Sequence, residues 1–246
     1  MTNKHAIYKQ LTTHNSQLTK YAFTLAETLI VMGIIGVVAA LTLPNLNSST
    51  GDKEKVVKVK KIYQNLNDVM GRAVAVYGPV EDWFVNDLNS TAQTTRAGER
   101  LTEFMKLSKN CEMNKGCYSD DSVIISHYYE VILSDGTGLG IRGFSNSIQF
   151  AIDIDGINKG KNSEGYDQFI FVTNNGSVEP YGMNSSPYQK GASTIYAYCL
   201  VAPFVGCARW VIDFDNMDYL KLDSSGKCPN GKALNVSANP PVTSCN

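Results

Sequence analysis

The longest apolar stretch of the chain runs from Leu25 to Leu43, and its only charged residue is Glu27. A helix of these 19 residues, at about 1.5 Å per residue, reaches roughly 28 Å, close to the ~30 Å hydrocarbon core of a bilayer. The pattern therefore predicts a membrane-spanning helix. A carboxylate at that depth costs on the order of 2.5–3.5 kcal/mol, so Glu27 indicates a function and a charged partner.

A second pattern follows from Asp52 to Tyr77, where apolar residues recur at spacings of three and four, as on one face of an amphipathic helix. The residues of this predicted face are Val56, Val59, Ile62, Tyr63, Leu66, Val69, Met70, Ala73 and Val76. Pro44 and the segment 45–51 (NLNSSTG) predict a kink or an interruption between the two helices. Gly78-Pro79 predicts the end of the second helix.

The remainder of the chain has mainly strand patterns. Residues 80–110 are predicted to form a linker with a short helix near 97–107. Strands are predicted at 123–133, 148–154, 168–173 and 209–214, with turns at Asp135-Gly136, Asp155-Gly156 and Asn175-Gly176. The expected fold class is α+β, with an antiparallel sheet of hairpins packed on the helix of residues 52–77.

Charge and cysteine placement agree on where the chain is located. Residues 1–22 contain Lys4, Lys9 and Lys20 and no acidic residue, which predicts that this end stays in the cytoplasm and the remainder is exported. All six cysteines lie beyond residue 110, as expected in an oxidising compartment. The net charge of −1 gives no sign of nucleic-acid binding.

The junction of the basic segment and the apolar run has a specific order, with Lys20-Tyr21-Ala22 directly before Phe23-Thr24-Leu25-Ala26-Glu27. It resembles the class III signal of type IV prepilins and type II secretion pseudopilins. The resemblance implies that a prepilin peptidase cuts between Ala22 and Phe23 and N-methylates Phe23, with the apolar run retained. The family usually has Gly before the cut, where this chain has Ala22.

The resemblance also implies a structural role, in which the carboxylate of Glu27 pairs with the amino terminus of Phe23 in a neighbouring subunit. Pro44 stands where the family places a proline. The implied regions are a leader (1–22), a membrane and filament-core helix (23–44), an amphipathic helix (45–79) and a pilin-like, β-rich head with disulfides (80–246). The implied partners are the peptidase, other pilin or pseudopilin subunits and an inner-membrane assembly platform. The implied location is the bacterial inner membrane, then a periplasmic or extracellular filament.

Other interpretations stay open. The chain could be a membrane-tethered extracellular binding domain that never polymerises. It could also be a secreted domain cut after Ala40, in which case a hydrolase would depend on a carboxylate or on His127. No G-x-S-x-G, H-E-x-x-H or P-loop motif occurs, so we predict that the chain is not an enzyme.

Two groups of residues are candidate sites, one in the head and one on the amphipathic helix. Asp153, Asp155, Asn158 and Asp167 lie in a Gly-rich stretch and could supply oxygen ligands to Ca²⁺. The alternative is a strand that ends in an Asp-Gly turn, with acids that bond backbone amides. The basic run Lys53, Lys55, Lys58, Lys60 and Lys61 could contact lipid headgroups, DNA or acidic neighbours, or form a solvated face.

The cysteines contain no C-x-x-C pair typical of a zinc site. Sequential pairing is the simplest of 15 connectivities, with separations of 6, 8 and 17 for Cys111/Cys117, Cys199/Cys207 and Cys228/Cys245. The segment 206–220 resembles one near the C-terminus of pseudopilins, where a disulfide closes a surface loop, and this supports the pair Cys199–Cys207.

Overall fold

The computed structural model describes residues 24–84, 89–113, 116–117, 128–144, 146–156, 159–181, 199–200 and 206–245, with the backbone alone for 39–50. The chain divides into two compact units, Met1–Asn47 and Ser48–Asn246. The helices are α1 (Leu25–Tyr77), η1 (Val80–Trp83), α2 (Ser90–Thr102), α4 (Cys207–Phe214) and η2 (Asp218–Lys221). The strands are β1 (Leu107–Glu112), β2 (Tyr129–Leu133), β3 (Gly138–Phe144), β4 (Ser147–Asp153), β5 (Gln168–Asn174) and β6 (Ser177–Pro180).

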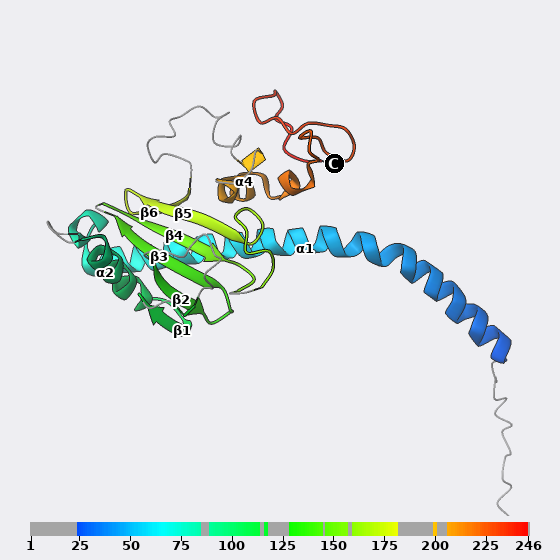
Figure 1. The fold of residues 1–246 in the computed structure, drawn as a ribbon, viewed down its shortest axis with the longest axis horizontal. Helices are drawn as coiled ribbons and strands as arrows, with labels where there is room; N and C mark the ends of the chain where they lie inside the picture. The colour runs from blue at the N-terminus through cyan, green and yellow to red at the C-terminus, as the bar shows by residue number, and fades with distance from the viewer. Residues whose placement is uncertain are drawn as a thin grey trace, which may run out of the picture. The chain divides into compact units, whose positions relative to one another are not determined.

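The six strands form one antiparallel sheet in which spatial order follows chain order, from β1 to β6 (Figure 1). The predicted turns at Asp135-Gly136 and Asn175-Gly176 lie in the β2–β3 and β5–β6 hairpins. Asn175 and Gly176 both have positive φ, at 48° and 79°, as a tight hairpin turn requires. The α+β class and the antiparallel sheet are therefore confirmed.

The second half of α1 packs on this sheet. Every residue of the predicted apolar face is buried or in contact with the core except Val76, which is 63% exposed. Tyr63 stacks on Phe171 of β5, with 5.6 Å between ring centroids. Asn67 Oδ1 accepts a hydrogen bond from the Val178 N–H at 3.0 Å, which ties the edge strand β6 to the helix. The helix and the sheet thus share one core.

The prediction near Pro44 was a kink or an interruption, and the interruption is not found, because α1 is continuous from Leu25 to Tyr77. Proline inside a helix removes one backbone hydrogen bond, and its effect ranges from a kink to a break. A single lost donor does not end this helix.

The segment 209–214 was predicted as a strand and is the helix α4 instead. Cys207, Trp210 and Val211 are buried and Phe214 packs against them, at the three- and four-residue spacing of one helical face. A short run of apolar and aromatic residues fits either period, so composition alone gave the wrong element.

The region 80–110 is more ordered than the predicted linker. It contains η1, α2 and β1, and it contributes Val80, Trp83 and Leu101 to the core. Helix α2 spans Ser90–Thr102, earlier than the helix predicted near 97–107. It lies so close to the sheet that a Cβ on Gly98 would fall 2.1 Å from the Tyr129 ring. Close packing here explains a glycine inside a helix.

Strands β1, β3 and β6 were not predicted. The sequence of β3, GLGIRGF, contains three glycines, and glycine is depleted in strands on average. A Cβ on Gly143 would lie 2.6 Å from the Gln93 carbonyl oxygen of α2. The backbone of α2 lies so close to this strand that only glycine fits at residue 143. Because glycine is rare in strands, the sequence of β3 did not indicate a strand.

Candidate functional site

Glu27 lies at the start of α1 in a reciprocal set of hydrogen bonds with Thr24. The Thr24 N–H and hydroxyl both donate to Glu27 Oε2 at 2.9 Å, and the Glu27 N–H donates to Thr24 Oγ1 at 3.2 Å. This is a capping box, which satisfies backbone donors at the beginning of a helix. The Thr-x-x-Glu order was visible in the sequence, and our sequence reasoning missed it.

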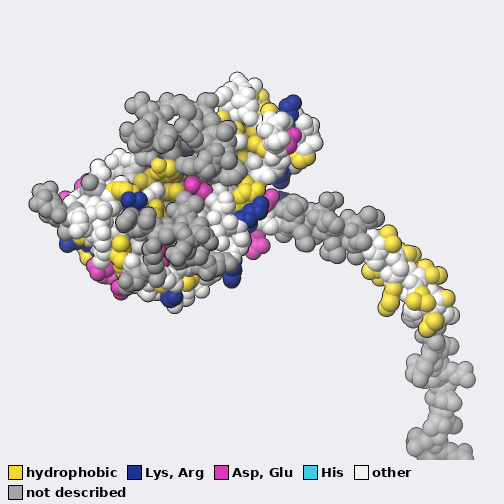
Figure 2. Space-filling model, viewed as in Figure 1, with side chains coloured by type: hydrophobic (Ala, Val, Ile, Leu, Met, Phe, Trp, Pro, Cys, Tyr) yellow, Lys and Arg dark blue, Asp and Glu magenta, His cyan; other side chains and the backbone are white. Residues whose placement is uncertain are grey.

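The residues that follow Glu27 present apolar side chains on all sides. Leu25 is 81% exposed and Met32 is 71% exposed, and the other large apolar side chains through Val38 are exposed as well. Figure 2 shows these apolar side chains along the described residues of this segment. A helix that is apolar all round is stable in water only when something covers it. In the part of the chain that the structure describes, no helix is long and apolar enough to cross a membrane.

The other residues of the predicted processing and assembly site are less completely described. Ala22 and Phe23 lie outside the described residues, and Pro44 is described by its helical backbone alone. Of the basic run, Lys60 forms an ion pair with Asp215, and Lys55 Nζ donates to the Tyr166 carbonyl oxygen at 3.2 Å. These two lysines therefore bind other parts of the head.

The predicted acidic residues gather in the connection between β4 and β5, which we call the acidic loop (residues 154–167). Asp167 is fully buried and accepts three backbone hydrogen bonds, from the N–H groups of Lys161 at 2.6 Å, Asn162 at 2.9 Å and Ser163 at 2.7 Å. Its carboxylate therefore acts as the structural centre of the loop, because both oxygens are engaged by peptide groups.

Asp153 precedes the loop and is also fully buried. It accepts hydrogen bonds from the Gly156 N–H at 3.1 Å and from Gln168 Nε2 at 3.3 Å. Burial, followed by the hydrogen bond with Asp155, raises its pKa to about 7. Asp155 Oδ1 is buried and has no hydrogen-bond partner. Two carboxyl groups thus share a poorly solvated space, and the charge of Asp155 also disfavours ionisation of Asp153.

These positions fit the calcium prediction only in part. The point where a Cβ of Gly160 would stand is 2.1 Å from Asp155 Oδ2 and 2.5 Å from Asp167 Oδ2, so the two carboxylates converge. Yet Asp167 already accepts three N–H groups, as a loop scaffold does, and Asn158 lies outside the described residues. Among the described residues, no group of three or more His, Cys, Asp or Glu side chains has an arrangement that could hold a metal ion.

The raised pKa values of two carboxyl groups in and beside the acidic loop predict how the stability of the protein depends on pH. Burial raises the pKa of Asp153 and of Glu164 to about 7 each, above the 3.8 and 4.5 of the free groups. A raised carboxyl pKa means that the folded state holds the proton more tightly than the unfolded state. The stabilising contribution is therefore complete below about pH 4 and is lost as the pH rises through about 7.

We accordingly expect the melting temperature of the protein to fall between pH 5 and pH 8, by roughly 2–4 °C for each kcal/mol lost. Calorimetry across this range measures the slope. Asp153→Asn keeps an oxygen that accepts from the Gly156 N–H but does not titrate, so this variant should show a flatter profile. A profile as steep as that of the wild type would contradict the role of Asp153.

The acidic loop also joins two other parts of the head. The Tyr219 hydroxyl donates to the Gly165 carbonyl oxygen at 2.6 Å, and Lys55 of α1 donates to the next carbonyl, that of Tyr166. Burial raises the pKa of Tyr219 well above its usual value, so this phenol remains a donor at neutral pH. The loop therefore connects α1 with the C-terminal residues.

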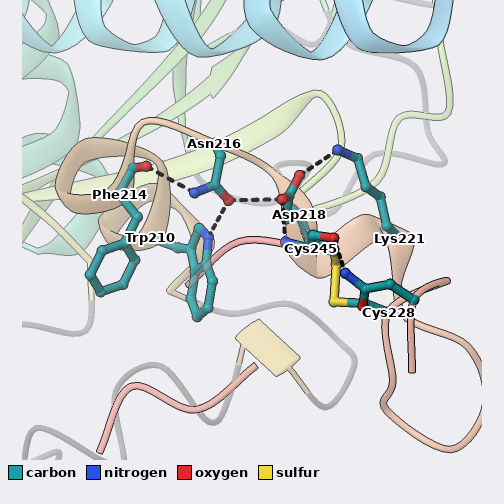
Figure 3. Close-up of polar contacts among 8 residues, drawn as sticks. Trp210, Phe214, Asn216, Asp218, Lys221, Cys228 and Cys245 are labelled. Atoms are coloured by element: carbon teal, nitrogen blue, oxygen red, sulfur yellow. Dashed lines mark hydrogen bonds and ion pairs between the residues drawn. A yellow bond between two sulfur atoms is a disulfide. The ribbon is translucent and has the colours of Figure 1, made fainter. Parts of the chain in front are cut away.

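The C-terminal module (residues 206–245) is held by a buried carboxylate that our sequence reasoning did not identify. Asp218 accepts from the Cys245 N–H at 2.7 Å and pairs with Lys221 (Figure 3). Asn216 Oδ1 accepts from both the Asp218 N–H and Trp210 Nε1, at 2.9 and 3.0 Å. These contacts attach the end of the chain to α4 and η2. No local pattern marks Asp218, because its main partner lies 27 residues away.

The three predicted disulfides are confirmed, as Cys111–Cys117, Cys199–Cys207 and Cys228–Cys245. The structure leaves no cysteine free. Cys228–Cys245 closes the outer loop of the C-terminal module next to Asp218, so a covalent bond and a buried carboxylate fix the same chain end.

Comparisons with known proteins found no matching family model, no curated protein with a similar sequence and no solved structure with a similar fold.

Proposed function

We propose that the chain is a pilin-like subunit of a type IV pilus or of a type II secretion pseudopilus. In this proposal it enters the bacterial inner membrane with its N-terminus in the cytoplasm, loses residues 1–22 and polymerises through the helix that begins at Phe23. The heads then lie in the periplasm or outside the cell. Prepilin peptidase, other pilin subunits and an inner-membrane assembly platform are the proposed partners.

The observation that carries this proposal is the position of Glu27. It is the one charge in an apolar segment whose large side chains are exposed on every side, and it follows a basic leader with Phe23 at the junction. A single charge in such a segment requires a partner when the segment is covered. The amino terminus of a neighbouring copy, freed at Phe23, has the charge and the depth to supply one.

The fold is consistent with this proposal. The amphipathic part of α1 packs on an antiparallel sheet, and three disulfides lie in the same head. We propose that the exposed apolar part of α1 forms the core of a filament and the head forms its surface. The alternative remains a membrane-tethered binding domain that does not polymerise.

The first experiment is the intact mass and N-terminal sequence of the protein from membranes and from sheared extracellular material. The proposal predicts a chain that begins at Phe23 and has one added methyl group. A chain that begins at Met1 would favour the tether, and one that begins at Leu41 would favour a secreted domain cut after Ala40.

Calcium binding by the acidic loop stays a prediction. Addition of Ca²⁺ to the metal-free protein would raise its melting temperature if the loop binds the ion. Asp155→Ala would abolish that increase, because Asp155 has the carboxylate oxygen without a hydrogen-bond partner. A melting temperature that does not change with Ca²⁺ would contradict calcium binding, and these acidic residues would then have only a structural role.

A further inference from the structure

Cys228 has two other cysteines at almost equal separations along the chain. Cys245 follows it by 17 residues, and Cys207 precedes it by 21. The probability that a flexible loop closes falls with about the 3/2 power of its length, so these two closures differ by less than roughly twofold. Loop length therefore gives Cys228 little preference for Cys245 over Cys207.

The backbone of Cys245 is held on both sides by groups other than its disulfide. Its N–H donates to Asp218 Oδ2 at 2.7 Å, and its carbonyl oxygen accepts from Asn230 Nδ2 at 2.5 Å. Its Sγ lies 3.7 Å from the Asp218 carbonyl oxygen. Because the two hydrogen bonds use main-chain atoms of Cys245, they hold this residue next to Cys228 without the sulfur–sulfur bond (Figure 3).

Asp218 is itself placed by residues that are close to it in the sequence. Its N–H donates to Asn216 Oδ1 at 2.9 Å, and Trp210 Nε1 of α4 donates to the same oxygen at 3.0 Å. Lys221, three residues later, pairs with Asp218 Oδ1 at 2.5 Å. Contacts at such short separations have a small entropic cost of loop closure, so they can form before the chain end returns.

The carboxylate of Asp218 provides a specific place for that chain end. The residue is only 4% exposed, and a buried carboxylate is costly unless its oxygens accept hydrogen bonds. Lys221 pairs with Oδ1, and among the described residues the donor to Oδ2 is the Cys245 N–H. The N–H groups of the other five cysteines, all of them described, do not bond to this carboxylate, so the contact distinguishes Cys245 from them.

We propose that Asp218 is a positioning residue for oxidation of the head, which holds Cys245 beside Cys228 while both are still thiols. The oxidant is a disulfide-containing carrier. One cysteine thiolate attacks the disulfide of the carrier, forms a mixed disulfide and releases the first carrier thiol. The other cysteine thiolate then displaces the second carrier thiol and forms the Cys228–Cys245 bond. Two electrons and two protons pass from the cysteines to the carrier.

Asp218 touches the backbone of Cys245 and takes no part in the transfer of electrons. All of these residues lie within the head unit, so the contact does not depend on the proposed function. Failure of filament assembly would leave it unchanged.

Equilibration with glutathione tests this role. Full-length protein in detergent is brought to equilibrium with mixtures of reduced and oxidised glutathione, from both the reduced and the oxidised side. Free thiols are then alkylated, and peptide masses give the pairing of each cysteine. Asp218→Ala should lower the equilibrium constant of Cys228–Cys245 roughly tenfold or more, because a charge-assisted hydrogen bond to Cys245 is lost. The constants of Cys111–Cys117 and Cys199–Cys207 should remain those of the wild type.

Two further variants serve as controls. Asp223→Ala removes an acid of the same module that accepts the N–H groups of Ser225 and Lys227, and it should leave the constant of Cys228–Cys245 within about twofold of the wild type. Asp218→Asn keeps an oxygen for the Cys245 N–H, so it should lower that constant less than Asp218→Ala does.

Re-oxidation of the reduced, denatured chain measures the selection directly. In the wild type, Cys228 should pair early with Cys245 in preference to Cys207. In Asp218→Ala the two products should approach the ratio set by loop length, within about twofold of each other. A wild-type ratio or a wild-type constant in Asp218→Ala would overturn the proposal. An equal fall for Cys199–Cys207 would also overturn it, because Asp218 would then support the whole module rather than position Cys245.

Discussion

Replacement of Glu27 by Ala is expected to abolish filament assembly while the head still folds and forms its disulfides. Removal of one partner from a buried ion pair costs about 3–5 kcal/mol, or roughly two to four orders of magnitude in the equilibrium constant of each subunit contact. The head should be unaffected, because the hydrogen bonds that the Glu27 side chain accepts from described residues come from Thr24, at the start of α1. The measurement is the amount of protein in the sheared fraction relative to the membrane fraction.

The capping box supplies the control for this experiment. Gln replaces Glu in a capping box without loss of its hydrogen bonds, so Glu27→Gln keeps the helix start and removes only the charge. If the charge pairs with a neighbouring amino terminus, Glu27→Gln should fail to assemble almost as fully as Glu27→Ala. Normal filaments from Glu27→Gln would reduce the role of this residue to helix capping. Thr24→Ser retains the same hydrogen bonds and should assemble like the wild type.

The second large effect is expected at Asp167. Its replacement by Ala leaves three buried or half-buried N–H groups, those of Lys161, Asn162 and Ser163, without their acceptor. Hydrogen bonds to a charged group contribute about 1.5–3 kcal/mol each, and the losses within one loop are not additive, so we expect about 3–5 kcal/mol in total. For a chain of this size the melting temperature should fall by roughly 10 °C.

Asp155→Ala is the matched control, since it removes a carboxylate from the same loop whose Oδ1 accepts no hydrogen bond. This variant loses the hydrogen bond with Asp153 but keeps the three N–H groups that donate to Asp167, so it should lose less stability than Asp167→Ala. Equal losses at Asp155 and Asp167 in the presence of Ca²⁺, and not in its absence, would instead show that the two carboxylates hold a metal together.

Hydrogen exchange extends this test to the neighbouring elements. The Gly165 and Tyr166 carbonyl oxygens of the loop accept hydrogen bonds from Tyr219 and Lys55. Loosening of the loop in Asp167→Ala should therefore raise exchange in η2 and in the adjacent turn of α1. Faster exchange confined to the loop would mean that it is attached to the head without supporting it.

Periodicity in the sequence was sufficient for the features that depend on neighbouring residues. The amphipathic half of α1 could be predicted because one buried face repeats over many turns, and only Val76 departed from it. The Asp135-Gly136 and Asn175-Gly176 turns could be predicted because their backbone needs residues that tolerate positive φ. Sequential disulfides followed from short separations along the chain. The Phe23–Glu27 motif is likewise local, although its assembly role remains a proposal.

Only the tertiary structure decided the features that depend on partners distant in the sequence. The run 209–214 fits a strand or a helix, and the packing of Trp210 against Phe214 and Tyr219 selects the helix. The glycines of β3 argue against a strand in the sequence, and only the close approach of α2 to Gly143 gives a reason for a glycine there. The sequence around Asp218 does not distinguish it from other acidic residues, because the N–H group that donates to it belongs to Cys245, 27 residues later. A carboxylate becomes structural when the fold removes its water and supplies its donors, and that requires the folded chain.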